Sequence, residues 1–474
     1  RIGLDQPELD FVDIDPTRDT PLFIDPYAIS VQNDAWSEEC HRHINHFFQT
    51  ALNKIKRGDH EGAKALLNGL GEPNETCLGL SRGQPAGRGI GGRQALDIYD
   101  SLAASQAAQS GILSELAECD LFVSGIGRDK ISDMTTNIVR RLLLEYTIAQ
   151  CALHGIELTG EYPSGRYWDI DRMSWHTNYS PMPVVNGKRI LLVPKYSVRR
   201  SLALEAQEYY SHHVLNFIQQ EELERGSPLV RVLKSGERRP PTKKILKEHF
   251  PFSKDFLGQF SEENQEVLNV YKQLHQRLEL EGGVLEQKDF NEDYDEAIFS
   301  RAMIESLQSI ETGNDMADRF HSLMVGVIEF IFWPHLIYPV KEDPIHEGRK
   351  RIDITYTNAA TYGFFHRTHT AHEIASNRVM VECKNYSKDP ANPELDQLSG
   401  RFSINRGKLG LLIYRTVSDY TRLVARCRDT AVDGRGIIVP LGDAQIIHFL
   451  QLIENRQRNQ IDRELEQILS RIIS

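Results

Sequence analysis

The last third of the sequence alternates between short apolar runs and segments of helical periodicity, and this order limits the folds open to the chain. Residues 315–333 have the spacing of a helix that ends before Pro334. Strands are expected at 335–340, 348–358, 378–384, 408–415 and 436–441, and further helices at 394–402 and 416–431. The order α-β-β-β-α-β, with an additional α-β, predicts an α/β domain with a mixed central sheet.

The strand expected at 378–384 ends in two charged residues. Its sequence VMVECKNYS leads from apolar residues to Glu382 and Lys384 and then becomes polar. Residues two apart on a strand share a face, so the carboxylate and the ammonium would lie about 7 Å apart on one side of the sheet. Such a Glu–Lys pair occurs by chance in most proteins of this size, so it indicates a functional site only together with the residues and elements around it. The alternative is an ordinary exposed strand end.

A second carboxylate is expected nearby. In RIDITYT, Ile354 and Tyr356 alternate with Asp353, so Asp353 would lie on the face opposite to them and approach Glu382 where the two strands pair. Paired carboxylates repel each other unless a cation neutralises them, and hard oxygen ligands suit Mg²⁺ or Mn²⁺. Such an ion activates a bound water, and Lys384 would add positive charge beside a scissile phosphate.

These residues carry a resemblance to a known superfamily. Asp353 followed by Glu382-Cys383-Lys384, in an αβββαβ order, resembles the PD-(D/E)XK nucleases, and ECKNY is similar to the core of the Mrr type. Gln397, thirteen residues after Lys384, resembles a glutamine of Mrr-like and RecB-like nucleases. Ile352 stands where the name of the superfamily has proline, and the 29-residue step from Asp353 to Glu382 indicates an inserted loop.

The resemblance implies a restriction-endonuclease-like domain that cleaves DNA phosphodiesters with Mg²⁺ or Mn²⁺. It implies Asp353, Glu382 and the backbone carbonyl of Cys383 as metal ligands, and Lys384 and Gln397 as further catalytic residues. The first helix of such domains often adds an acid, and Glu329 is the matching position.

Charge is distributed unevenly along the chain. The net charge is −12, but residues 341–474 hold 20 Lys and Arg against 17 Asp and Glu, while the preceding part holds 35 against 50. Because salt screens distant charge, the C-terminal part can still bind a phosphate backbone. The basic residues expected to contact DNA are Arg349, Lys350, Arg351, Lys388, Arg406 and Lys408.

The chain is expected to form three regions, which are a mostly helical one at 1–160, an α+β one at 161–310 and the nuclease-like domain, with C-terminal helices, at 315–474. Asn186-Gly187 between apolar runs predicts a hairpin near 182–194. Asp129 or Ser132 could cap a helix start, and the polar, proline-rich segment 234–244 is expected to be a loop basic enough to touch phosphate. Longer helices are expected at 93–108, 132–154, 197–224 and 261–281.

Three other groups of residues suggest a ligand less specifically. Two groups of residues have a spacing of three positions: Cys40, His43 and His46, and His366, His369 and His372. This spacing spreads the side chains around a helix instead of placing them on one face. Ordinary surface or loop histidines are therefore the expected interpretation, and zinc ligands are the alternative. The glycine-rich segment 81–94 lacks the phosphate-loop pattern, although Arg88 or Arg93 could bind an anion.

The sequence as a whole predicts a cytoplasmic, metal-dependent DNA endonuclease. No apolar run reaches the length of a membrane helix, and the six cysteines have no paired spacing. Residues 1–310 would form a sensing, regulatory or oligomerising module, acting through a partner protein or ligand in a dimer or larger homo-oligomer. By resemblance, restriction or anti-phage defence is the expected setting. Processing of DNA in repair or recombination and a catalytically inactive module for nucleic-acid binding or assembly remain alternatives.

Overall fold

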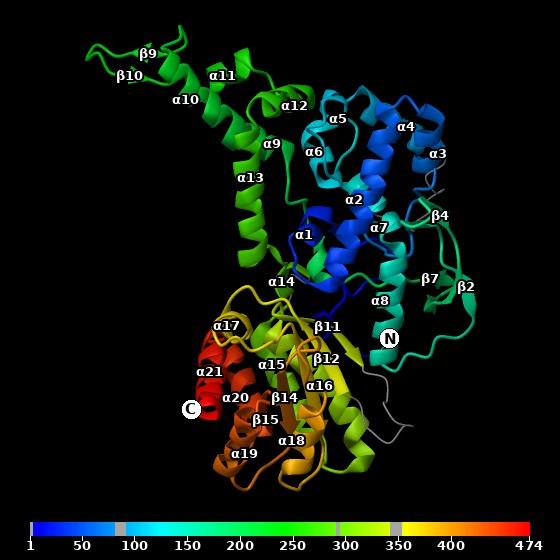
Figure 1. The fold of residues 1–474 in the computed structure, drawn as a ribbon, viewed down its shortest axis with the longest axis vertical. Helices are drawn as coiled ribbons and strands as arrows, with labels where there is room; N and C mark the ends of the chain where they lie inside the picture. The colour runs from blue at the N-terminus through cyan, green and yellow to red at the C-terminus, as the bar shows by residue number, and fades with distance from the viewer. Residues whose placement is uncertain (1–2, 81–91, 291–293, 342–352) are drawn as a thin grey trace.

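Two hydrophobic cores divide the molecule. The computed structural model describes residues 3–80, 92–290, 294–341 and 353–474, without the side chains of residues 92, 93 and 353. One core draws its residues from positions 12–271 and the other from positions 303–472 (Figure 1). The first core includes residues on both sides of position 160, so the expected division there does not coincide with a break in packing.

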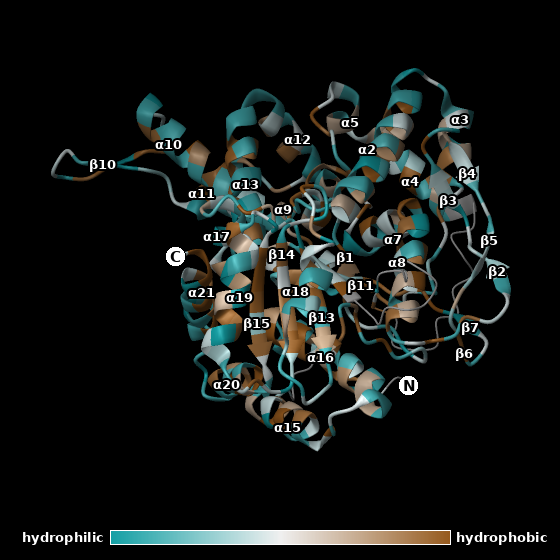
Figure 2. Ribbon diagram, turned by 60° about the horizontal axis from the view of Figure 1, so that its bottom comes forward, coloured by the Kyte–Doolittle hydropathy of each residue, from teal (hydrophilic) through white to brown (hydrophobic). Residues whose placement is uncertain are grey.

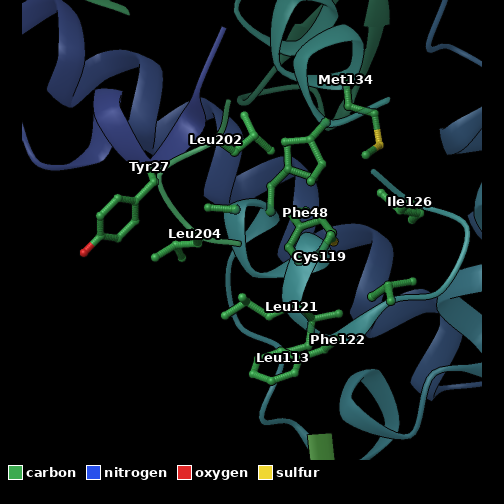
Figure 3. Close-up of a cluster of buried hydrophobic side chains, with 14 of the residues drawn as sticks. Tyr27, Phe48, Leu113, Cys119, Leu121, Phe122, Ile126, Met134, Leu202 and Leu204 are labelled. Atoms are coloured by element: carbon green, nitrogen blue, oxygen red, sulfur yellow. The ribbon is translucent and has the colours of Figure 1, made fainter. Parts of the chain in front are cut away.

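The N-terminal core is built from helices. Asp34 caps the longest of them by accepting hydrogen bonds from the backbone of Trp36 and Ser37, and one face of this helix then buries Phe47 and Phe48. Figure 3 shows how Phe48 lies among side chains from several segments of this core. The helices are α1 Pro26–Ser30, α2 Ala35–Lys56, α3 His60–Leu67, α4 Gly92–Ala104, α5 Gln106–Ser110, α6 Cys119–Phe122, α7 Arg128–Ile138 and α8 Arg140–Leu153.

Two sequence expectations for these helices need correction. The helix expected at 132–154 is two helices that meet at Val139, and α7 begins earlier, with Gly127 at the N-cap position. Asp129 lies in the first turn of α7, where its negative charge interacts favourably with the helix dipole. Ser132 does not cap, because its hydroxyl accepts a hydrogen bond from the Ile24 backbone N–H at 2.9 Å.

The region after α8 contains short paired strands. The predicted hairpin near 182–194 is present, and its turn residues Asn186 and Gly187 have φ values of 52° and 78°, as a type I′ turn requires. The pairs are β1 Phe23–Ile24 with β8 Val198–Arg199, β2 Glu161–Pro163 with β5 Tyr179–Pro181, β3 Tyr167–Asp169 with β4 Ser174–His176, β6 Val184–Val185 with β7 Lys188–Arg189, and β9 Arg231–Val232 with β10 Arg238–Arg239.

Helices return after β8. The helix expected from 197 begins only at Ala206, because Val198 and Arg199 pair with β1, and the helix expected at 261–281 is interrupted at Asn264. A π-helical segment, η4 Tyr209–Val214, joins the first two helices. The helices are α9 Ala206–Glu208, α10 Leu215–Arg225, α11 Lys243–His249, α12 Lys254–Glu263, α13 Gln265–Leu278, α14 Gln287–Phe290 and α15 Glu296–Ser309.

The C-terminal core surrounds a five-stranded mixed sheet of order β11-β12-β13-β14-β15. The first three strands are antiparallel to one another, and the last three are parallel. The strands are β11 Leu336–Lys341, β12 Asp353–Asn358, β13 Arg378–Lys384, β14 Leu409–Tyr414 and β15 Ile437–Gly442, and the helices are α16 Ala317–Phe332, α17 Gly363–Thr370, α18 Asn392–Ser399, α19 Tyr420–Val432, α20 Asp443–Glu454 and α21 Gln460–Ile473.

Helices cover both faces of this sheet. The Tyr356 hydroxyl of β12 donates to the Val325 carbonyl of α16, and α18 contacts the opposite face through Gln397 and Lys384. The strands β14 and β15 are apolar almost throughout, as expected for strands covered on both sides (Figure 2). The predicted α/β order is therefore present, with one addition, since α17 lies in the stretch between β12 and β13 that was expected to be a loop.

The two cores are joined through the first residues of the chain. The short helix η1, Gln6–Glu8, packs on α16. Asp10 accepts hydrogen bonds from the Tyr338 backbone N–H at 3.0 Å and from the Tyr146 hydroxyl at 2.7 Å. A third apolar cluster, which includes Leu9, Tyr146 and Tyr338, surrounds these contacts. The junction is therefore a packed interface between residues distant in sequence.

Candidate functional site

The end of β13 presents Glu382 and Lys384 on one face of the sheet. Val381 and Cys383 point to the other face and are buried. Asp353 is the register partner of Glu382 in the antiparallel pair of β12 and β13, which puts the two residues at directly opposed positions. The side chain of Asp353 lies outside the described residues, so its place in this group is a register position.

Glu382 is the most deeply buried charge of the group. Its side chain is 2% exposed, and one oxygen forms an ion pair with Lys384 Nζ. The other oxygen lies 3.3 Å from the Arg401 guanidinium. Two cations thus face a buried carboxylate, and these ion pairs offset part of the cost of burying its charge.

Gln397 joins this group from α18. The Lys384 ammonium donates to Gln397 Oε1 at 3.2 Å, so the structure brings Gln397 to the lysine as the sequence predicts. Arg401, which the sequence did not single out, comes four residues after Gln397 and two residues beyond the end of α18. A basic residue so close after the helix that carries Gln397 is the signal that could have identified Arg401.

The backbone of Cys383 has a partner of its own. Its carbonyl lies 3.1 Å from His321 Nε2, which donates when the proton is on that nitrogen. Burial lowers the pKa of His321, against the opposing effects of this hydrogen bond and of the Glu382 charge. The neutral imidazole therefore holds one side of the carbonyl that the resemblance assigns to a metal. His321 was also missed, and its position within an apolar helix was the available signal.

The loop after β13 is braced by buried polar contacts. Asn385 donates to the backbone carbonyls of Glu311 and Gly313 at 3.1 and 2.9 Å and accepts from Arg415 at 2.7 Å. Arg415 also donates to Asp443 at 2.7 Å. These contacts fix the end of β13, and with it the direction of Lys384.

The expectation for Glu329 needs correction. Glu329 lies on α16, which packs on the sheet face opposite to Glu382, and its carboxylate is 3.0 Å from Lys195 Nζ. Burial raises the pKa of Glu329 above its ordinary range, and the charge of Lys195 opposes that rise. Glu329 therefore belongs to the junction of the two cores rather than to the group around Glu382.

The predicted DNA contacts are placed in part. Lys388 and Arg406 are exposed, and Lys408 Nζ lies 3.4 Å from the Gly434 carbonyl. Arg349, Lys350 and Arg351 lie outside the described residues.

The alternative zinc groups have ordinary surroundings. Cys40 and His43 are buried on α2, and His46 accepts a hydrogen bond from the Trp168 indole at 3.1 Å. His366 and His369 lie on α17 and line a cavity of about 950 Å³ between the two cores. Arg88 lies outside the described residues, as does the side chain of Arg93.

The donor chemistry of the group suits a hard divalent cation. The described residues, which do not include the Asp353 side chain, contain no cluster of three or more His, Cys, Asp or Glu side chains that could hold a metal. What the structure supplies is a buried carboxylate, Glu382, beside the register position of a second acid. Oxygen donors of this kind fit Mg²⁺ or Mn²⁺.

Comparison with known proteins adds one finding. Residues 1–205 match a family model described as a domain of unknown function, DUF8370. No curated protein and no solved structure matches the chain. Within the described residues, helices that are both long and apolar enough to cross a bilayer are absent.

Proposed function

We propose that the C-terminal domain is a metal-dependent endonuclease that hydrolyses DNA phosphodiesters. The observation that carries this proposal is the register of Asp353 against Glu382, with Lys384 on the same face and in contact with Gln397. The order of elements around the sheet also agrees with the order expected for a restriction-endonuclease-like core.

The residues have distinct parts in this proposal. Asp353, Glu382 and the Cys383 carbonyl would hold Mg²⁺ or Mn²⁺, which when bound supplies a water of lowered pKa and positive charge at the phosphate. Lys384 pairs with Glu382 in the described state and would turn its ammonium toward the developing phosphate charge. Gln397 holds Lys384 and would orient it or the attacking water.

A non-catalytic alternative also has an observation in its favour. Both Glu382 oxygens already face cations, Lys384 and Arg401, as in a buried structural ion pair. In that case the domain would bind nucleic acid or assemble without cutting. As the resemblance implies, the catalytic alternative would serve restriction or anti-phage defence, or else DNA repair or recombination.

Cleavage assays separate these functions. Purified protein would be incubated with supercoiled and linear DNA in Mg²⁺, in Mn²⁺ and in EDTA. We expect nicking that needs the metal and falls by about 10²-fold or more in Lys384→Ala, because transition-state charge concentrates there. Lys288→Ala, which removes an exposed lysine of α14, serves as the matched control.

Glu382→Ala tests the metal ligand separately. It should also abolish nicking, but excess Mn²⁺ should restore part of that activity and should restore none in Lys384→Ala. Equal cleavage by wild type and Lys384→Ala would move the site elsewhere. Intact DNA binding without cleavage in either metal would favour the non-catalytic alternative.

A further inference from the structure

A projecting, positively charged segment lies far from Glu382 in the fold. It comprises residues 225–247, here called the basic arm, and includes the end of α10, the hairpin β9–β10 and the start of α11. Figure 1 shows the hairpin standing away from the rest of the molecule at one end, whereas α18 lies at the other. The basic arm holds eight Lys and Arg and one Glu, a formal charge of +7 in a chain of −12.

The hairpin is polar and open to solvent. Its turn is closed by hydrogen bonds between Leu233 and Glu237 and between Gly236 and Leu233, both of 2.9 Å, with Gly236 at a φ of +83°. The exposed basic residues of the arm are Arg225, Arg231, Lys234, Arg238, Arg239, Lys244 and Lys247. Val232 of β9 is 66% exposed, so this apolar side chain adds little to the core.

Like charges oppose each other across this hairpin. Arg231 and Arg239 are register partners, and directly opposed like charges destabilise a two-stranded pair. Arg239 is relieved by Glu237 at 3.2 Å, but within the described residues Arg231, Lys234 and Lys244 have no ion-pair partner. A short, isolated hairpin that keeps such a pair is better suited to an anionic partner than to stability on its own.

We infer that the basic arm binds the phosphate backbone of duplex DNA by laying the β9–β10 hairpin in a groove. A two-stranded ribbon fits the major groove, which is about 12 Å wide. Residues 225–247 include no Phe, Tyr or Trp, the side chains on which single strands stack, so a duplex fits better than a single strand. The choice of DNA among anionic partners rests on the proposed function.

The inference gives residues 161–310 a direct part in substrate binding. The basic arm and α18, which carries Gln397 of the Glu382 group, lie at opposite ends of the molecule (Figure 1), so one protein would contact a duplex at two separated places. Affinity should therefore depend on the length of the duplex. A duplex of about 60 base pairs, about 200 Å long at about 3.4 Å per base pair, should gain more affinity from the arm than one of about 12 base pairs.

Binding assays on the full chain in EDTA test the inference without cleavage. The arm variant carries Arg231→Gln, Lys234→Gln, Arg238→Gln and Arg239→Gln. The matched control removes four exposed basic residues from the N-terminal core, through Arg18→Gln, Lys56→Gln, Arg57→Gln and Arg172→Gln. Both variants change the net charge equally.

We expect the arm variant to bind the longer duplex at least about tenfold more weakly and to reduce the slope of log affinity against log salt by about one unit per lost phosphate contact. The control should bind like wild type. Unchanged affinity and slope in the arm variant would overturn the inference.

Two further readouts keep this test separate from the proposed function. If wild type never cleaves DNA but loses duplex affinity with the arm, the inference stands and the nuclease proposal fails. If the arm variant keeps its DNA affinity and instead loses self-association in sedimentation, the anionic partner is a second copy of the acidic N-terminal part, and the inference is wrong. Matching thermal unfolding of the two variants confirms that the fold is intact.

Discussion

Lys195 and Glu329 form an ion pair that is closed to solvent, with Nζ and Oε1 3.0 Å apart and side-chain exposures of 0% and 1%. Lys195 comes from the part of the chain that matches the family model, and Glu329 from α16 of the C-terminal core. The ammonium also lies 4.2 Å from the centre of the Trp333 ring. The pair therefore lies where the two cores meet. The attraction between the two charges and the contact of the ammonium with the Trp333 ring offset the cost of removing the charges from water.

Removing one partner should destabilise the protein more than removing both. Glu329→Met leaves Lys195 buried and unpaired, and we expect the free energy of unfolding to fall by about 3–5 kcal/mol. The double variant Lys195→Met with Glu329→Met should recover most of that loss, because no charge is left uncompensated. Urea denaturation followed by fluorescence measures both values. The exposed pair Arg277 and Glu281 is the control, and its removal should lower the free energy of unfolding by at most about 1 kcal/mol. A double variant whose loss of stability equals the sum of the two single losses would contradict the expectation.

Gln397→Ala should slow cleavage without abolishing it. Its amide oxygen accepts from Lys384 at 3.2 Å, so its loss frees the ammonium to adopt other positions. We expect a rate lower by about 10- to 100-fold, as for other residues that orient a reacting group. Single-turnover cleavage at saturating DNA measures the rate, and Gln397→Glu should retain more activity than the alanine variant because it keeps an acceptor. Wild-type cleavage by Gln397→Ala would show that the residue only packs.

Arg401 should position Glu382 rather than bind metal. The guanidinium lies 3.3 Å from the second Glu382 oxygen, where it would compete with a cation for that oxygen. In Arg401→Ala we expect the maximal cleavage rate to fall by about 10-fold or more, because the Glu382 carboxylate loses one of the two cations that fix its position. The Mg²⁺ concentration for half-maximal rate should not rise. Titration with Mg²⁺ measures both quantities. Glu382→Ala, which should raise the Mg²⁺ concentration for half-maximal rate, is the comparison. The same rise in Arg401→Ala would refute the positioning role.

Asp133 should make stability depend on pH. Burial, reinforced by the charges of Asp129, Glu72 and Asp19, raises its pKa to about 8 from an ordinary value of 3.8. Between these values the folded protein keeps a proton that the unfolded chain has released. The stability from this group is therefore complete below about pH 3.8 and is lost as the pH rises through 8.

Asp133→Asn removes this titration, so the variant should gain stability relative to wild type between about pH 5 and about pH 8.5. The gain should reach a few kcal/mol, since one pKa unit corresponds to about 1.4 kcal/mol. Urea unfolding at several pH values measures it, with the exposed Asp171→Asn as a control. Parallel pH profiles of wild type and Asp133→Asn would exclude this role.

The order of helices and strands along the C-terminal part of the chain could be predicted because apolar periodicity is a local property. The run VMVECK forms β13, and its alternation places Glu382 and Lys384 together and Cys383 on the other side. The contact of Gln397 with Lys384 was also accessible, since both residues lie on elements that are adjacent in sequence.

Contacts that depend on tertiary packing could not be predicted. Lys195 is 134 positions from Glu329, and no periodicity relates the two. The helix expected from 197 fails because residues 198 and 199 pair with β1, a partner far away in sequence. His321 faces the end of β13 only because α16 packs across that sheet face.

The short helix η1 makes the packing of the C-terminal core depend on residues from the N-terminal part of the chain. A Cβ added at Gly326 on α16 would lie 3.0 Å from the Cβ of Glu8 in η1, so this close contact leaves little room for a side chain at position 326. Asp10 then reaches the backbone of Tyr338 in β11. An isolated C-terminal domain would lose these contacts and expose the surface of α16 around Gly326 together with the Glu329 carboxylate. Substitutions in one core would therefore have to stay compatible with the other, and joining the sheet to a different N-terminal domain would require keeping residues 6–10.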